Sequence, residues 1–278
     1  MTPTTFPTTK GHRLTGTFFA PESPERAVVI HAATGVPAAF YHPFATWLME
    51  SHGARVLTYD YRDFGASASG PVKASRATMA EWGVDDQSAA LDHLIAGAGE
   101  LPVWSVGHSL GGFMVPFHAR ADRLERHIAI ASGPAFHWHH PWRFVPQALA
   151  LWYLIGPPAT ALLGYLPGRR IGLGADLPAG VYWQWRRWCT AREFFRLDFG
   201  RGLEPPDLSR LTARIDLVAI SDDVMIPPRV VARLAEFFPK GASTFREVDP
   251  RDHGLAQVGH IHAFHPRNRA LWPALIAA

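Results

Sequence analysis

The chain has 278 residues, 47% of them hydrophobic, so it can bury a large core, and disorder over most of its length is excluded. Its formal net charge is only +3, with basic and acidic residues interleaved, and we expect no nucleic-acid partner. Cys189 is the single cysteine, so an intrachain disulfide is excluded as well.

The first residues, MTPTTFPTTKGHRLTG, contain no charged region followed by an apolar stretch. They therefore do not resemble a secretory signal, and the sequence predicts a cytoplasmic protein. No stable membrane span is expected either. The apolar stretch from residue 144 to 166 is interrupted by Pro146, Gly156, Pro157 and Pro158, which leaves pieces well short of the ~20 residues that a span needs.

Short apolar runs alternate with longer helix-like segments, the pattern of a mostly parallel sheet flanked by helices. Strands are predicted at residues 14–19, 27–31, 55–59, 103–107, 128–132, 215–220 and 244–248. Helices are predicted at residues 40–52, 79–98, 228–238 and 267–277. The first strand is a candidate for one arm of an antiparallel hairpin at the edge of the sheet.

Residues 134–206 break this alternation. They contain six of the ten tryptophans, namely Trp138, Trp142, Trp152, Trp183, Trp185 and Trp188. We interpret them as a helical cap inserted into an α/β core formed by residues 1–133 and 207–278. Some cap tryptophans are expected to line the substrate pocket, and the candidates are Trp138, Trp142 and Trp183.

A Gly-x-Ser-x-Gly motif follows a predicted strand and precedes a helix-like run. It is formed by Gly107, His108, Ser109, Leu110 and Gly111. A sharp strand-to-helix turn strains its central residue and needs small neighbours, which the glycines supply. The turn also directs the positive end of the new helix at the serine hydroxyl. We therefore predict Ser109 as a nucleophile.

This motif and its context resemble the α/β-hydrolase superfamily, in particular hydrolases with a His-Ala-x-Thr-Gly segment after an early strand, here at residues 31–35. The resemblance implies the α/β-hydrolase fold and a Ser, Asp, His order along the chain. In residues 221–228, SDDVMIPP, Asp223 matches the family's acid position, with Asp222 as the rival. In Gly259-His260, His260 matches the family's base, and His253 is second.

The resemblance also implies two backbone N–H donors for an oxyanion. One is Leu110, which follows the nucleophile. The other is Ala33, with Thr34 one step away, and Ala32 stands where the family usually has glycine. The segment that begins at Asp60 resembles a loop that supports the site in this family, and we interpret it as structural.

The sequence thus predicts a serine hydrolase that cleaves an apolar carboxylic ester, or an amide or thioester, through an acyl-enzyme. An acyltransferase of the same fold and a non-catalytic binding protein remain alternatives. No cofactor and no metal is predicted, since the histidines at 260, 262 and 265 and at 137, 139 and 140 lack the partner ligands of a zinc site. The natural substrate and the oligomeric state are not predicted.

Overall fold

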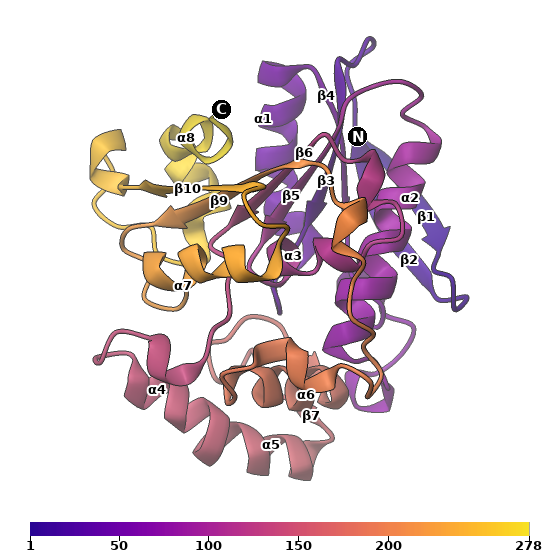
Figure 1. Ribbon diagram of the computed structural model, residues 1–278. Helices are drawn as coiled ribbons and strands as arrows, with labels where there is room; N and C mark the ends of the chain where they lie inside the picture. Colours follow the sequence, from indigo (N-terminus) through magenta and orange to yellow (C-terminus); the bar gives the residue numbers. More distant parts are fainter. Residues whose placement is uncertain (278) are drawn as a thin grey trace.

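A computed structural model describes residues 1–277 (Figure 1). Its eight-stranded sheet has the order β1-β2-β4-β3-β5-β6-β9-β10. The strands are β1 (Thr2–Pro7), β2 (Arg13–Phe19), β3 (Arg26–His31), β4 (Ala54–Tyr59), β5 (Val103–His108), β6 (Arg126–Ile130), β9 (Arg214–Ile220) and β10 (Ser243–Val248). The first two strands pair antiparallel with each other, β2 pairs antiparallel with β4, and all later neighbours are parallel.

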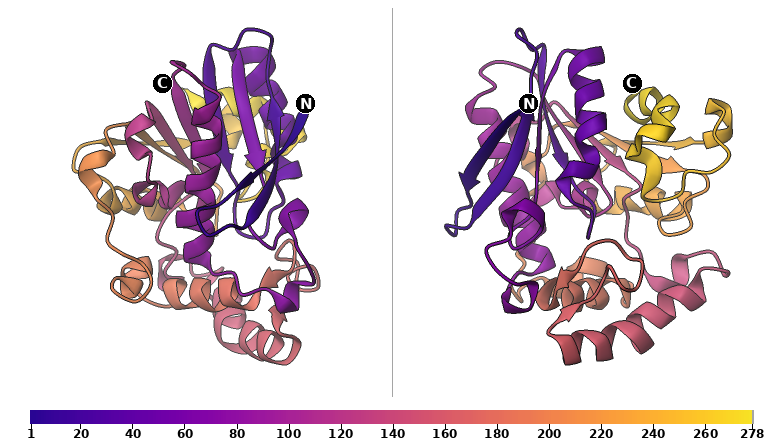
Figure 2. Two further views of the ribbon diagram at one scale, coloured as in Figure 1. Left: turned by 90° about the vertical axis from the view of Figure 1, so that its right-hand side faces the viewer. Right: turned by 180° about the vertical axis from the view of Figure 1, so that it is seen from behind.

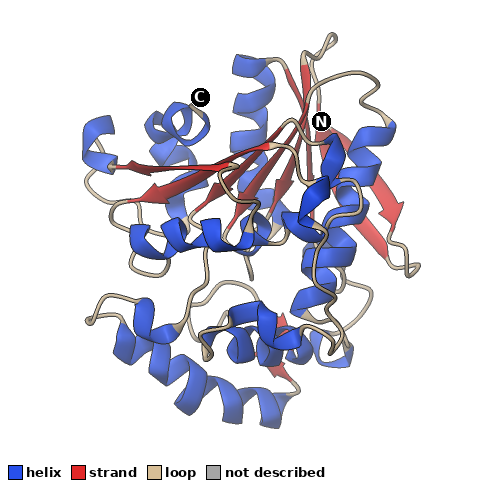
Figure 3. Cartoon of the chain, viewed as in Figure 1, coloured by secondary structure: helices blue, strands red, loops and turns tan. Residues whose placement is uncertain are grey.

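Helices cover both faces of the sheet (Figures 1 and 3). One face carries α1 (His42–His52) and α8 (Trp272–Ile276), and the other carries α2 (Gln87–Ala96), α3 (Leu110–Phe113) and α7 (Pro228–Arg233). The rings of Phe44 in α1 and Trp272 in α8 pack 5.4 Å apart at their centroids. The central strands are therefore buried on both sides, which explains their continuous apolar runs.

All seven predicted strands are present, and the prediction of an antiparallel edge hairpin is confirmed by the pairing of β1 with β2. The strand predicted at residues 128–132 instead covers Arg126–Ile130. It ends early because Ala131 has a φ of 49°, which is outside the range of an extended strand. Helix 79–98 is present as a helical stretch to Ala96 that includes the wide π turn Glu81–Asp86.

The helix predicted at residues 267–277 is two separate pieces. A 3-10 segment covers Pro266–Leu271, and α8 begins only at Trp272. Asn268 leaves helical geometry within the first piece. Pro273, which has no N–H to donate, sits in the first turn of α8, where that loss costs nothing.

Most of the segment between β6 and β9 forms a separate layer below the sheet in Figure 1, and the same layer is seen from two other sides in Figure 2. We call it the insertion. Its elements are α4 (Val145–Leu149), the π turn Ala150–Ile155, α5 (Gly156–Leu163), β7 (Tyr165–Leu166), β8 (Leu177–Pro178) and α6 (Ala179–Cys189). β7 and β8 pair antiparallel. No helix within residues 1–277 is both long and apolar enough to span a membrane.

Candidate active site

Ser109 lies at the turn between β5 and α3. Its backbone has φ 54° and ψ −112°, a strained conformation for a residue with a side chain. Such a turn requires glycine nearby: a Cβ on Gly111 would overlap the carbonyl oxygen of His31, and one on Gly107 would overlap the backbone of Gly111. The strained turn holds Ser109 at the carboxyl end of β5, as the motif predicts.

His260 and Asp223 form a buried pair beside this turn. His260 Nδ1 lies 2.7 Å from Asp223 Oδ2, and the two side chains are 6% and 0% exposed. Because a carboxylate only accepts hydrogen bonds, Nδ1 is the donor of this bond, which leaves Nε2 outside it. The other oxygen of Asp223 accepts the backbone N–H groups of Met225 and Ile226 at 2.8 and 2.9 Å.

Asp222, the rival acid, binds a different target. Its two carboxylate oxygens accept the backbone N–H groups of Val258 and Gly259 at 2.7 and 2.9 Å. It therefore holds the loop that presents His260, while its neighbour Asp223 contacts the imidazole itself. The adjacent carboxylates thus support the same histidine through its backbone and through its ring. The second candidate base, His253, ends a 3-10 turn at Pro250–His253 and does not line the cavity described below.

Tyr41 and His108 link three parts of the site. Burial lowers the pKa of His108 well below its ordinary value, so the ring is neutral and carries one proton. Its Nε2 donates to the carbonyl of His260 at 3.0 Å, which leaves Nδ1 to accept the Tyr41 hydroxyl at 2.8 Å. The oxygen of Tyr41 in turn accepts the N–H of Ala33 at 2.9 Å. This chain of bonds joins the turn after β3 to the residue before Ser109 and to the loop of His260.

The Ala33 amide, the donor that the sequence resemblance indicates, is therefore already engaged by Tyr41. Ala33 is also only 1% exposed and does not line the cavity at Ser109. Thr34 does line that cavity, and no acceptor within residues 1–277 receives its N–H. The geometry thus favours the alternative position. Leu110, the other predicted donor, is the first residue of α3, where N–H groups have no partner inside the helix.

Ser109 and His260 open into the same cavity, of about 510 Å³. The other polar side chains on its wall are few, and include Thr34, His140 and Gln147. Burial lowers the pKa of His140 to about 4, so that ring is neutral near pH 7. The remaining wall is mainly apolar, from both the sheet edge and the insertion: Phe113, Phe144, Ala148, Leu151, Trp152, Ile155, Ile171, Leu173, Trp185, Phe194 and Ile226. This is the wall of a site for an apolar group.

The expectation for the pocket tryptophans is corrected. Trp138 and Trp142, exposed at 59% and 77%, line a separate surface hollow that includes neither Ser109 nor His260. Trp152 and Trp185 line the cavity instead, with ring centroids 4.9 Å apart. Nothing in the local sequence distinguishes Trp152 or Trp185 from the other tryptophans of the insertion, because the residues around Trp152 are apolar at nearly every position. Cys189 also lines the cavity, and burial raises the pKa of its thiol.

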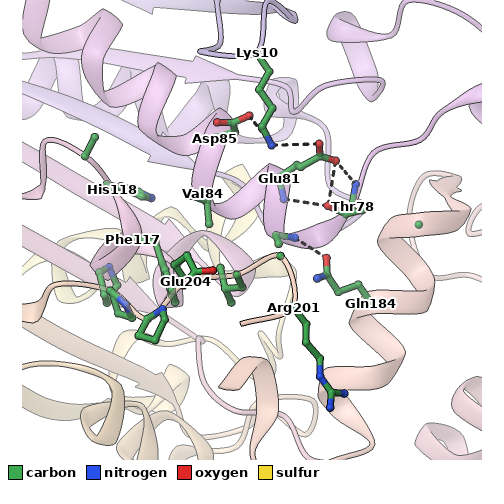
Figure 4. A pocket seen from close by; sticks show the side chains of 18 of the residues that line it. Lys10, Thr78, Glu81, Val84, Asp85, Phe117, His118, Gln184, Arg201 and Glu204 are labelled. Carbon is green, nitrogen blue, oxygen red and sulfur yellow. Dashed lines mark hydrogen bonds and ion pairs between the residues drawn. The ribbon is translucent and has the colours of Figure 1, made fainter. Parts of the chain in front are cut away.

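Trp183 lines a larger hollow, of about 780 Å³, whose wall comes from the insertion and from the core. Figure 4 shows this hollow. Lys10 there approaches Glu81 and Asp85 at 3.7 and 3.6 Å. The wall of this hollow is strongly charged and includes neither Ser109 nor His260. Ser109 and His260 therefore share the smaller, apolar cavity and not this hollow.

The predicted support loop is present as a buried polar network. Asp60 accepts the N–H groups of Ala38 and Ala66, both at 2.8 Å. Arg62, 1% exposed, pairs with Asp86 at 2.7 Å and with Asp85 at 2.9 Å. These contacts fix the loop after β4 against the helix that begins near residue 79. Within residues 1–277 no group of three or more histidine, cysteine or acidic side chains is arranged to hold a metal ion.

The sheet order and the strained serine that follows its central strand define the chain as an α/β hydrolase. It belongs to the serine aminopeptidase S33 family, whose model matches residues 22–246. None of the curated proteins searched matches the sequence.

Many solved structures share the fold. A thermophilic esterase from Thermogutta terrifontis is 18% identical, with a TM-score of 0.57 over 99% of this chain and 97% of the esterase. A hydrolase from Pseudomonas aeruginosa PA01 is 18% identical, with a TM-score of 0.59 over 99% and 98% of the two chains. A monoacylglycerol lipase from Paleococcus ferrophilus is 19% identical, with a TM-score of 0.56 over 95% and 98%. At these identities the likeness concerns the fold.

Proposed function

We propose that this hydrolase cleaves a carboxylic ester of an apolar acid or alcohol, or a related thioester or amide, through an acyl-enzyme on Ser109. The observation that carries the proposal is the Asp223–His260 hydrogen bond of 2.7 Å at the wall of the apolar cavity onto which Ser109 opens. A serine hydroxyl needs a base to take its proton, and a neutral histidine held by a carboxylate is such a base. The esterase and lipase among the structures of the same fold agree with this reaction class.

In the proposed reaction, Ser109 Oγ attacks the carbonyl carbon while His260 Nε2 takes the hydroxyl proton. The carbonyl oxygen becomes an oxyanion, and we assign its two donors to the N–H groups of Leu110 and Thr34. The histidine then gives its proton to the leaving alkoxide, and Asp223 stabilises the imidazolium throughout. Water, activated by the same histidine, attacks the acyl-enzyme and releases the acid and free Ser109.

We further propose that residues 134–206 act as a cap over the core formed by residues 1–133 and 207–278. The cavity wall supports this division, because Trp152 and Trp185 come from the insertion while Ser109 and Ile226 come from the core. An apolar wall with few polar side chains favours an uncharged substrate, as carboxylesterases and lipases use.

The test is hydrolysis of p-nitrophenyl esters of increasing acyl length by the wild type and by Ser109→Ala. We expect turnover of short to medium esters, reduced at least ~10³-fold in the variant. Ser132→Ala is the matched control, since that hydroxyl donates to the Ser109 carbonyl at 2.6 Å without belonging to the proposed reaction, and it should lose less than ~10-fold. Equal turnover by wild type and Ser109→Ala would refute the mechanism. A fluorophosphonate that leaves Ser109 unlabelled would indicate a binding protein instead.

A further inference from the structure

The insertion contains a helical run whose outer face has no charged side chain. The run covers residues 145–163 and joins α4, the π turn and α5. We call it the outer helical run. Its sequence, VPQALALWYLIGPPATALL, contains no Asp, Glu, Lys or Arg. A surface helix of a water-soluble protein ordinarily carries charged or polar residues on the face opposite its buried stripe, so this composition is unusual.

The buried side of the run is narrow. Ala148, Trp152, Gly156 and Thr160 are buried, and their spacing of four residues places them on one stripe. This stripe faces α6, where the Tyr182 hydroxyl donates to the carbonyl of Leu151 at 3.1 Å. The packing therefore uses one side of the run only.

The opposite side is apolar and exposed. Leu154 is 72% exposed and Leu162 is 85% exposed, with Pro158 and Ala161 also exposed on the same face. Trp142, 77% exposed, lies just before the run. Figures 1 and 2 agree that α4 and α5 form the lower margin of the molecule, with no other element beyond them. Large apolar side chains exposed together in this way mark an interaction surface.

Positive charge is concentrated in the segment that contains this apolar face. Residues 134–192 contain six arginines and a single carboxylate, Asp176, although the whole chain has a net charge of only +3. Arg143 lies over the ring of Trp142 at 5.2 Å, at the start of the run. Arg186 lies over the ring of Tyr153 at 5.2 Å, beside its middle. Arg169 and Arg170, both exposed, follow its end.

An apolar helical face bordered by arginines and an exposed tryptophan is complementary to a lipid surface that carries negative charge. A second copy of the chain fits less well, because a symmetric contact would bring two basic borders together. The run is too short and too interrupted to span a bilayer, so it would lie in the interface. We propose that the outer helical run docks the protein on the surface of an anionic phospholipid bilayer.

Docking in this orientation places the cavity next to the lipid. Ile155 belongs to the run, is 47% exposed and also lines the cavity at Ser109. The apolar outer face and the apolar cavity wall therefore meet at one residue. If the proposed esterase activity is correct, an ester dissolved in the bilayer has a short apolar path to Ser109. The docking itself requires no catalysis.

The test is co-sedimentation with vesicles of phosphatidylcholine containing 30% phosphatidylglycerol and with vesicles of phosphatidylcholine alone. We expect the wild type to bind the anionic vesicles at least 10-fold more tightly, and to bind them less as salt is raised. The charge variant Arg143→Ser/Arg169→Ser/Arg170→Ser should bind anionic vesicles about 100-fold more weakly. The apolar variant Leu154→Ser/Leu162→Ser should lose at least about 10-fold.

Matched control variants remove the same kinds of side chain from the surface of the core. Lys240→Ser/Arg267→Ser/Arg269→Ser removes three exposed positive charges, and Phe245→Ser removes an apolar side chain that is 45% exposed. Both should bind anionic vesicles as the wild type does. Wild-type protein that stays in the supernatant with both kinds of vesicle overturns the proposal, as do control variants that lose as much binding as the variants of the run.

Two further measurements separate the competing explanations. Sedimentation equilibrium reports whether the face is a dimer interface: a wild-type dimer that Leu154→Ser/Leu162→Ser converts to monomer, without vesicle binding, overturns the proposal. Ser109→Ala should bind vesicles as the wild type does while failing to hydrolyse soluble esters. Vesicle binding without any esterase activity in the wild type would therefore refute the proposed function and leave the docking intact.

Discussion

The sheet edge around Ser109 and the outer helical run differ in whether their side chains have partners within the protein. At the sheet edge, polar side chains such as His260, Asp223, Asp222 and His108 each have a hydrogen-bond partner within 3.0 Å. On the outer face of the run, large apolar side chains such as Leu162, which is 85% exposed, are left mostly uncovered. The sheet edge is therefore held in place by hydrogen bonds within the protein, whereas the outer face is suited to contact with another surface.

The largest effect is expected from replacing one of the two carboxylates at the sheet edge. We expect Asp223→Asn to lower kcat/KM for a soluble ester by ~10³–10⁴-fold, because an amide donor opposite Nδ1 favours the wrong tautomer of His260. Asp222→Asn should lower it less than ~10²-fold, because Asp222 holds only the backbone N–H groups of Val258 and Gly259. Steady-state kinetics with p-nitrophenyl butyrate measures both. Equal losses would contradict the division of roles.

A leucine-to-alanine substitution should lower the free energy of unfolding in the sheet but not on the outer helical run. Leu217 in β9 is 1% exposed, and Leu217→Ala should lower the free energy of unfolding by about 2–5 kcal/mol through the cavity it leaves. Leu162→Ala, at a position 85% exposed, should change it by less than about 0.5 kcal/mol. Urea unfolding checks both values. A large loss at Leu162 would mean that the outer face is packed in solution.

Buried histidines make the core sensitive to acid. Burial lowers the pKa of His118 to about 3 and of His127 to about 4, below the 6.5 of the unfolded chain. The unfolded chain therefore takes up protons first, so stability is full above about pH 7 and falls from pH 6.5 toward 4. The expected slope is about 1.4 kcal/mol per pH unit for each such histidine.

Urea unfolding across this pH range measures that slope. His118→Gln keeps an N–H donor for the carbonyl of Gly83. It should reduce the slope by about 1.4 kcal/mol per pH unit, the contribution of one proton. His12→Gln, at an exposed position, should leave the slope unchanged. A slope that is the same in all three proteins would show that His118 does not titrate on unfolding.

The smallest expected effect concerns Tyr41. Tyr41→Phe keeps the ring but removes the hydroxyl between Ala33 and His108, so the turn beside Ser109 loses an anchor. We expect kcat to fall about 10-fold with KM nearly unchanged, and the free energy of unfolding to fall by about 1–3 kcal/mol. Tyr153→Phe, 45% exposed, is the control and should change neither. A rise in KM alone would place the effect on substrate binding.

Much of the core could be predicted because its signals are local. The apolar runs of the strands, the glycines around Ser109 and the Asp222-Asp223 pair before Ile226-Pro227 are all contiguous in the sequence. Helix ends were less predictable, as the split at Asn268 shows, because a single backbone angle decides them. The family resemblance favoured Asp223 over Asp222, but the sequence did not predict that Asp222 would hold the backbone of the His260 loop, since that role depends on which distant group each carboxylate reaches.

The sequence alone therefore determined the positions of seven strands along the chain, the strained serine turn and the residue types available for a serine hydrolase. Only the tertiary structure decided which carboxylate meets His260, that Tyr41 occupies the amide of Ala33, and that Trp152 and Trp185 rather than Trp138 and Trp142 line the cavity. The physical reason is that backbone propensity acts between neighbours in the chain. Hydrogen bonds and cavity walls, in contrast, join residues up to 152 positions apart, as between His108 and His260.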